Sequence, residues 1–184
     1  LAEAFLLKDK DSTIIYDPRV IWNTEDIIKN NRGIGILSKT GHSHFKALMR
    51  KYDAIYGGEI SAHHYFRDFY YCDSGMIAFL LMLDFLGKSD KTLGGLINER
   101  IAKFPSSGEI NFEVANPDKI LTSITEKFSP VSVVEKIDGV SFSFENWRFN
   151  IRKSNTEPLI RLNIESNESY QIVETRLKMI SKLI

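Results

Sequence analysis

The sequence predicts an α/β mixed-sheet domain with flanking helices, followed by a small α+β domain with an antiparallel sheet. Two observations carry this prediction. Strand-like and helix-like segments alternate through the first part of the chain, which favours a mostly parallel sheet with crossover helices. After a run rich in proline, serine and glycine, "FPSSGE" at 104–109, short strands joined by turns lie between two helices. We therefore expect domains at residues 1–104 and 105–184.

The elements of the first domain follow from its hydrophobic pattern. Apolar residues at helical spacing predict helices at 1–7, 23–31, 42–52, 73–87 and 92–104. Short β-branched and aromatic runs predict strands at 12–17, 33–39 and 53–58. We expect Asn23 or Thr24 to cap the second helix, and Asp73 or Ser74 to cap the fourth.

In the second domain, residues 109–114 predict a strand and 116–128 a helix, with Asn116 as its cap and Pro117 as its first residue. Several strands joined by turns are expected in 131–166, where the "DG" dipeptide at 138–139 is a hairpin signal. An amphipathic helix at 169–184 closes the chain.

Composition narrows the class of protein. The 184 residues carry 24 Lys and Arg against 24 Asp and Glu, so the balance gives no indication of nonspecific binding to nucleic acid or to a membrane. The single cysteine, Cys72, excludes an internal disulfide framework and fits a cytoplasmic location. The longest apolar stretch, 76–87, contains Asp84 and is too short to span a bilayer. Because the chain opens within a helix and without methionine, we expect a piece of a longer protein.

Polar and basic side chains follow each of the three strands expected in the first domain. They are Arg19, the segment Lys39 to His42, and the segment Glu59 to His63. Ligands of such sheets bind beyond the carboxyl ends of the strands, so we expect these groups to share a pocket. Glu59 can accept two hydrogen bonds from neighbouring hydroxyls of a sugar, and Ser61 and His63 can donate or accept.

Simpler roles also fit these segments. Lys39 and His42 at a strand-to-helix junction suit an anion near the helix N-terminus, but the same segment fits a helix start capped by Thr40 or Ser43. Taken alone, Arg19 fits an ordinary surface arginine.

A metal site is a further alternative. The ligand types for zinc are present in His42, His44, His63, His64 and Glu59. His63 and His64 are adjacent, and adjacent residues of an extended segment point in opposite directions. No cysteine pair or HExxH motif accompanies the histidines. Both observations disfavour a metal site. We therefore expect no metal ligands in this chain.

The loop "RKSNTEP", 152–158, lies between two strong strand candidates. It holds more hydrogen-bond donors than a turn needs, in Arg152, Ser154, Asn155 and Thr156. An arginine fork, hydroxyls and successive backbone N–H groups together suit a phosphate. The alternative is a polar turn whose side chains bond their own backbone. Glu157 argues against an anion unless its carboxylate points away.

The segments "SKTGHS", "GGEISAHHYF" with "YYCDSGMI", and "RKSNTEP" occur in an order that resembles the C-terminal half of the α-D-phosphohexomutases. The resemblance covers essentially the whole chain and implies the third and fourth of four domains around a cleft. The details are most similar to the bacterial phosphomannomutases that supply GDP-mannose synthesis. Phosphoglucosamine mutases usually carry Gln at the position of Ile60 and Gly at that of Ala62.

The resemblance also implies roles for residues. Glu59, Ser61 and His63 would contact the ring hydroxyls of the sugar, and His63 is a candidate for proton transfer. The loop with Arg152, Ser154, Asn155 and Thr156 would hold the phosphate that is not reacting. Arg19, Lys39 and His42 would supply further basic contacts.

The implied reaction of the intact protein interconverts mannose 6-phosphate and mannose 1-phosphate. It uses a phosphoserine, Mg²⁺ and a hexose 1,6-bisphosphate that is both intermediate and activator. The phosphoserine motif and the Asp-rich Mg²⁺ loop belong to the N-terminal half of the family and do not occur in this sequence. We therefore expect the metal site and the nucleophile on that missing half, and no mutase activity from this chain alone. A phosphoglucomutase, a dual enzyme, and a non-catalytic sugar-phosphate binding module are the alternatives.

Overall fold

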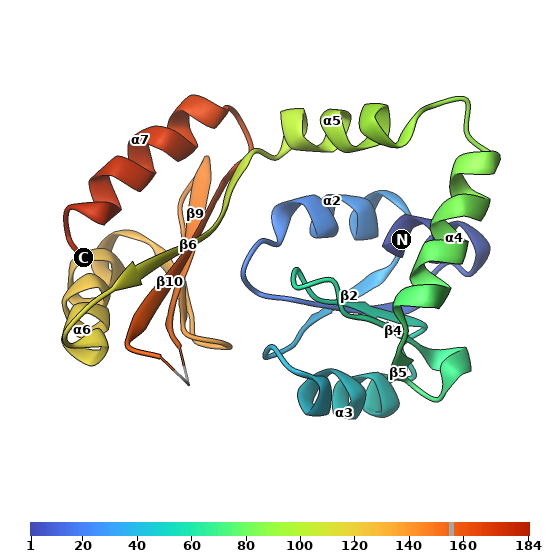
Figure 1. Cartoon of the computed structure of the whole chain (residues 1–184), viewed down its shortest axis with the longest axis horizontal. Helices are drawn as coiled ribbons and strands as arrows, with labels where there is room; N and C mark the ends of the chain where they lie inside the picture. Colours follow the sequence, from blue (N-terminus) through green and yellow to red (C-terminus); the bar gives the residue numbers. More distant parts are fainter. Residues whose placement is uncertain (155–156) are drawn as a thin grey trace. The chain divides into compact units, whose positions relative to one another are not determined.

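The computed structural model describes residues 1–154 and 157–184, which form two compact units, Leu1–Glu99 and Arg100–Ile184 (Figure 1). The division falls within helix α5 (Leu93–Lys103). Part of the segment that we expected to mark the domain boundary, 104–109, is regular structure, because strand β6 (Ser106–Glu113) begins inside it. Ser106 pairs with Glu165. The composition of residues 104–109 cannot reveal this pairing, because the partner is distant in the sequence.

The first unit contains a five-stranded mixed sheet in the order β2-β1-β3-β4-β5. Strand β1 (Thr13–Tyr16) lies parallel to both β2 (Ile34–Leu37) and β3 (Tyr56–Gly58). The sheet then continues antiparallel through β4 (His64–Phe66) and β5 (Cys72–Asp73). The sequence predicted the three parallel strands, whereas the antiparallel hairpin is too short to leave a periodic pattern.

Helices cover both faces of this sheet (Figure 1). Helices α1 (Ala2–Lys8) and α2 (Trp22–Asn30) pack on one face, and α3 (His42–Tyr52) packs on the other. Two further helices follow, α4 (Gly75–Gly87) and then α5. No helix in the described part of the chain combines the length and apolar character that a membrane span requires.

Each face of the sheet has its own core, because successive strand residues point in opposite directions. Tyr16 and Tyr56 belong to the core under α1 and α2. Ile15, the residue before Tyr16 on β1, belongs to the core under α3. So does Tyr65 of β4, which pairs with Gly57, the residue after Tyr56. This alternation separates Tyr65 from His64, its neighbour in sequence, and so places them in different surroundings.

The predicted helix caps were partly right. Ser74 caps α4 by accepting a hydrogen bond from the N–H of Ile77 at 3.2 Å, as predicted. The predicted caps of α2 were wrong, because this helix begins at Trp22 and places Asn23 and Thr24 in its first turn. Helix α3 follows Gly41, whose φ of +109° suits glycine, so neither Thr40 nor Ser43 is its cap.

The second unit is a five-stranded antiparallel sheet in the order β6-β10-β9-β8-β7. Its further strands are β7 (Val133–Glu135), β8 (Val140–Ser143), β9 (Trp147–Lys153) and β10 (Leu159–Ser166). Helices α6 (Pro117–Phe128) and α7 (Tyr170–Ser181) cover one face, and their apolar side chains complete a single core with it. Asn116 caps α6 by accepting from the N–H of Lys119, as predicted. The antiparallel sheet and its helices confirm the predicted α+β architecture.

Candidate functional site

The loops that follow the three parallel strands are joined by hydrogen bonds at one edge of the sheet. The backbone N–H of Gly41, after β2, donates to Oε2 of Glu59, after β3, at 2.9 Å. The backbone N–H of Ile60 donates to Oδ2 of Asp17, after β1, at 3.2 Å. The segments that we singled out after the three strands therefore meet at the carboxyl edge of the parallel sheet.

Glu59 lies at the centre of this arrangement and is only 7% exposed. Its second oxygen, Oε1, accepts the hydroxyl of Tyr65 at 2.6 Å. Burial, together with the hydrogen bond and negative charge of Glu59, raises the pKa of the Tyr65 hydroxyl, so the proton stays on tyrosine. A carboxylate has about four acceptor positions, and two are used here, so each oxygen retains capacity for a ligand hydroxyl.

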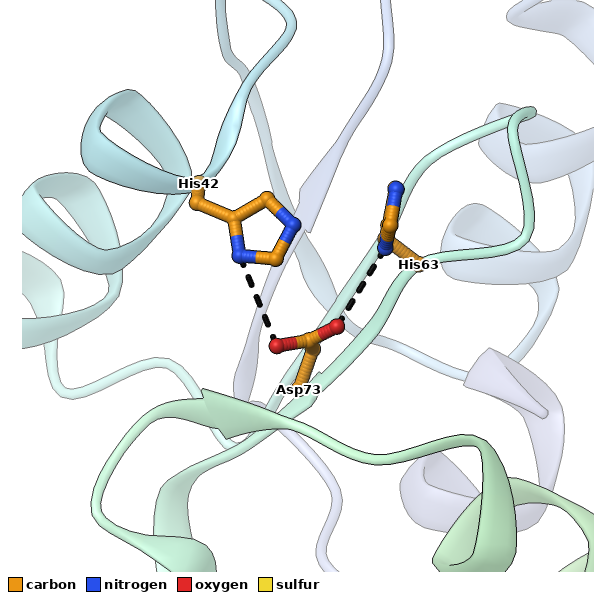
Figure 2. A group of neighbouring side chains, drawn as sticks. All are labelled: His42, His63 and Asp73. Carbon is orange, nitrogen blue, oxygen red and sulfur yellow. Dashed lines mark hydrogen bonds and ion pairs between the residues drawn. The ribbon is translucent and has the colours of Figure 1, made fainter.

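His42 and His63 converge on the carboxylate of Asp73 (Figure 2). The Nδ1 atom of His42 lies 3.4 Å from Oδ1 of Asp73, and Nδ1 of His63 lies 3.2 Å from Oδ2. The two rings stand edge to face, with centroids 4.6 Å apart. His42 opens α3, His63 precedes β4, and Asp73 ends β5, so three elements build one cluster.

Asp73 is a residue that sequence reasoning missed, since we considered it only as a helix cap. Its pairing with the histidines depends on β5 lying antiparallel beside β4, where Asp73 registers with Tyr65. The one available signal was its place in the segment "YYCDSGMI", which helped to carry the family resemblance.

The zinc set considered from the sequence is not the one that the structure assembles. Glu59 is engaged by Gly41 and Tyr65, and His44 is exposed on α3. His64 is hydrogen-bonded through Nδ1 to the hydroxyl of Tyr56 at 2.6 Å. Burial, with smaller contributions from the chain's terminal amine and His63, lowers the pKa of His64 and favours its neutral form.

Arg19 is buried, so its interpretation as an ordinary surface arginine was wrong. It is 6% exposed, and its Nε lies 2.9 Å from both carboxylate oxygens of Asp17. Asp17 in turn holds Ile60, so Arg19 braces the loop that carries Glu59. Lys39 and Ser61 are exposed at the same edge of the sheet.

In the second unit, Arg152 lies near the end of β9 and its Nη2 is 3.0 Å from Oε2 of Glu109. The backbone N–H of Ser154 donates to the carbonyl of Leu159 at 2.9 Å, which closes the base of the loop. The two remaining predicted phosphate ligands, Asn155 and Thr156, lie outside the described residues.

Arg161 was not predicted, yet it lies directly opposite Arg152 in the β9–β10 register. Its Nη1 is 3.5 Å from Oε1 of Glu109, so two guanidinium groups share one carboxylate. Glu157 is 3.7 Å from Nη2 of Arg161, and its carboxylate therefore approaches the cationic pair. Like charges directly across a strand pair are destabilising, and the carboxylates of Glu109 and Glu157 offset that repulsion here. Because the Glu157 carboxylate does not point away from the pair, it argues against an anion, as expected from the sequence.

The signal for Arg161 was present in the alternation of β9 and β10. Every second residue of these strands is polar, so these polar side chains all lie on the face opposite the helices. They are Arg148, Asn150, Arg152, Arg161, Asn163 and Glu165. Within the described residues, the Nε atoms of both Arg152 and Arg161 are buried and have no hydrogen-bond partner. Both amide atoms of Asn163 on the same face share this property, so it is not confined to the loop.

The metal implied by the resemblance, Mg²⁺, does not fit the cluster at Asp73. Magnesium prefers an octahedron of oxygen ligands, several of them water. The cluster offers two imidazoles and one carboxylate, whose ligating atoms lie within 4.8 Å of one another. The described residues therefore give this cluster the character of a nitrogen-rich site and not that of a magnesium site.

Comparison with known proteins identifies the class that this fold and site define. The model of "Phosphoglucomutase/phosphomannomutase, alpha/beta/alpha domain III" matches residues 1–104, and that of the "C-terminal domain" of the same family matches 109–183. The chain belongs to the phosphoglucomutase/phosphomannomutase family.

Relatives and solved structures agree with this assignment. A phosphomannomutase of Escherichia coli K12 is 50% identical over 185 residues, covering 100% of this chain and 41% of the relative. A phosphomannomutase of Vibrio cholerae is also 50% identical, over 100% of this chain and 40% of the relative. The crystal structure of a family member from Burkholderia thailandensis matches with a TM-score of 0.78 and 25% identity, covering 98% of this chain and 39% of that one. The chain thus spans about two fifths of these proteins.

Proposed function

We propose that this chain is the sugar- and phosphate-recognising part of a phosphomannomutase that interconverts mannose 6-phosphate and mannose 1-phosphate. The observation that carries the proposal is the 50% identity, across the whole chain, to proteins named phosphomannomutase. Two polar clusters of the kind that a sugar phosphate needs support it, one in each unit. The protein is an isomerase by family, and in this proposal it works in carbohydrate metabolism in the cytoplasm.

The sugar-binding role falls to Glu59, Ser61 and His63. Glu59 is already held by two protein donors, so its remaining lone pairs are aimed before the sugar arrives, which lowers the entropic cost of binding. Ser61 is exposed on the same loop and offers a hydroxyl. The Nδ1 atom of His63 faces Asp73 while its second nitrogen points away from that carboxylate (Figure 2). This arrangement suits exchange of a proton with a sugar hydroxyl at Nε2.

The phosphate-binding role falls to Arg152, Ser154, Asn155 and Thr156, to which we add Arg161. Both arginines are tied to Glu109, which neutralises part of their charge and holds the guanidinium groups in place. A phosphate dianion would relieve the repulsion between them and satisfy their unpartnered Nε donors. Arg19, Lys39 and His42 are the further basic contacts of this proposal, with Arg19 acting through Asp17.

The remaining chemistry belongs, in this proposal, to an N-terminal half comparable to the rest of the relatives' length. That half would contribute the phosphoserine and the Mg²⁺ site, with a hexose 1,6-bisphosphate as intermediate and activator. Phosphoryl transfer needs an activated nucleophile and neutralisation of charge. Residues 1–184 alone are therefore expected to fold but not to turn over sugar phosphate.

Calorimetry with mannose 1-phosphate and with mannose tests the phosphate role in the full-length protein. Arg152→Ala should weaken binding of the sugar phosphate by about 1.5–3 kcal/mol, the usual value of a hydrogen bond to a charged group, and leave binding of mannose unchanged. Lys153→Ala is the matched control, because Lys153 is the next residue and pairs with Asp118 at the surface. Equal losses in the two variants would contradict the assignment.

The sugar preference is tested in the full-length protein. Contacts to hydroxyls common to mannose and glucose cannot distinguish the epimers, so a phosphoglucomutase or dual activity is measured directly as the ratio of kcat/KM for the two 1-phosphates. A ratio that favours glucose would overturn the mannose assignment. No turnover with either sugar phosphate, despite binding, would favour a non-catalytic binding module.

A further inference from the structure

We propose that His42, His63 and Asp73 form a binding site for a divalent transition-metal ion of the zinc type. The site is separate from the magnesium chemistry of the proposed reaction. Its existence does not rest on the proposed function, because metal binding is measured on the chain without substrate.

The first observation in favour of a metal site is the spacing of the ligating atoms. Zinc lies about 2.0–2.2 Å from imidazole nitrogen and carboxylate oxygen, so two ligands of a tetrahedral ion stand about 3.3–3.4 Å apart. The two nitrogen-to-oxygen distances in the cluster are 3.4 Å for His42 and 3.2 Å for His63. Each histidine nitrogen therefore lies at such a separation from Asp73, His42 from Oδ1 and His63 from Oδ2 of its carboxylate.

The two histidines need only a small movement to complete the site. One ligating atom of each of the three residues lies within 4.8 Å of the other two. Closing the widest separation to the tetrahedral value takes roughly 1.5 Å, which rotation of the two half-exposed rings can supply. Figure 2 shows both rings beside the same carboxylate.

The protein also limits where these groups can lie, and rotation of the rings remains possible. The ring of His42 packs edge-on against Tyr65 at 5.3 Å between centroids. His63 is held by its own backbone, since its carbonyl accepts the N–H of Glu59 at 2.9 Å. Asp73 is fixed by the pairing of β5 with β4. Ordered ligands reduce the entropy lost on metal binding, and this raises affinity.

The chemistry of the ligands selects the kind of metal. Imidazole suits zinc, copper, nickel and iron, whereas magnesium and calcium prefer oxygen throughout. The side chains are 45%, 44% and 30% exposed for His42, His63 and Asp73, so an ion can enter and water can occupy its fourth position. Three protein ligands with one open position are the usual composition of an accessible zinc site.

Isothermal titration of the 184-residue chain with ZnCl₂ at pH 7.5 tests the site. We expect one equivalent of Zn²⁺ to bind, and excess Mg²⁺ to leave that binding unchanged. His42→Asn, His63→Asn and Asp73→Asn should each weaken it at least about tenfold, because even residues that only support metal ligands are worth about 10–100-fold. His44→Asn is the matched control, since His44 is an exposed histidine near His42 and outside the cluster. It should bind Zn²⁺ like the unmodified chain.

Imidazole NMR of the unmodified chain gives a second test that does not depend on the variants folding. One equivalent of Zn²⁺ should shift the ring resonances of His42 and His63 and leave those of His44 and His64 in place. The proposal is overturned if Zn²⁺ shifts all four histidines alike, if it shifts neither His42 nor His63, or if the control variant loses as much affinity as the cluster variants.

Discussion

Tyr65 donates its hydroxyl to Glu59 at 2.6 Å, and both side chains are buried beneath the loop that follows β3. The bond ties the proposed sugar-binding carboxylate to the core beside α3, where Tyr65 stacks on Phe45 with centroids 5.1 Å apart. The orientation of Glu59 is therefore set by the interior of the first unit as well as by its own loop.

Tyr65→Phe should lower the free energy of unfolding of the first unit by about 1.5–3 kcal/mol, because it removes a hydrogen bond to a buried carboxylate. Urea denaturation measures this through Trp22, which lies in the first unit, in a Trp147→Phe background. Tyr71→Phe is the control, since the hydroxyl of Tyr71 donates to Asp53 at an exposed position and should be worth at most about 0.5 kcal/mol. A similar loss in both variants would contradict the anchoring role of Tyr65.

The stability of the first unit should fall as the pH drops below about 6.5, the usual pKa of histidine. The pKa of His64 is lowered in the folded state, so the unfolded chain binds the proton more readily in this range. Stability rises with pH wherever the unfolded state holds more protons, and it therefore decreases as the solution is acidified through this window. Thermal melts between pH 5 and 8 should show a shallower slope for His64→Gln than for His44→Gln. Equal slopes would count against His64.

Arg148 and Glu165 form an ion pair at 2.9 Å in which neither side chain is exposed. Arg148→Met should destabilise the second unit by about 3–5 kcal/mol, because it removes the arginine that pairs with a buried carboxylate. Fluorescence of the adjacent Trp147 follows the transition in a Trp22→Phe background.

Two variants complete the test of this pair. Lys153→Met removes an exposed ion pair with Asp118 and should cost no more than about 1 kcal/mol. The double variant Arg148→Met/Glu165→Met should recover much of the loss, since apolar replacement of a whole buried pair is often close to neutral. A double variant as unstable as Arg148→Met would show that packing, and not the lone charge, is responsible.

Gly139 approaches the strand that carries Arg152. A Cβ added there would lie 2.4 Å from the carbonyl oxygen of Ile151 and 2.5 Å from Cβ of Arg152. Gly108 has the same φ of +67° as Gly139 but has open space around it. Gly108→Ala should therefore cost only the backbone strain of about 1–2 kcal/mol, and Gly139→Ala should cost clearly more in urea denaturation. Gly139→Ala should also weaken binding of mannose 1-phosphate, because it displaces Arg152. Equal costs would show that strain alone acts at both positions.

Most elements could be predicted from local pattern. Residues 42–52 and 117–128 repeat apolar side chains at helical spacing, and both are helices with those bounds. The caps Ser74 and Asn116 were also readable, because a capping side chain bonds its own helix within three residues. The failures came where the partner is distant in sequence. Strands β4 and β5 have three and two residues, too few for a periodic signal, and they exist because they pair with β3 and with each other.

The two polar clusters could also be predicted from the sequence only in part. The hydrogen-bonding groups of Glu59 and His63, on the loop after β3, and of Arg152, near the end of β9, could be recognised from the sequence because residue type fixes donors and acceptors. The meeting of His42 and His63 at Asp73, and of Arg161 with Arg152 at Glu109, depends on register between strands and on the packing of α3 against the sheet. Helical and strand periodicity can be recognised from residues that are close together in the sequence. Charged groups from separate elements come within bonding distance only when the chain folds.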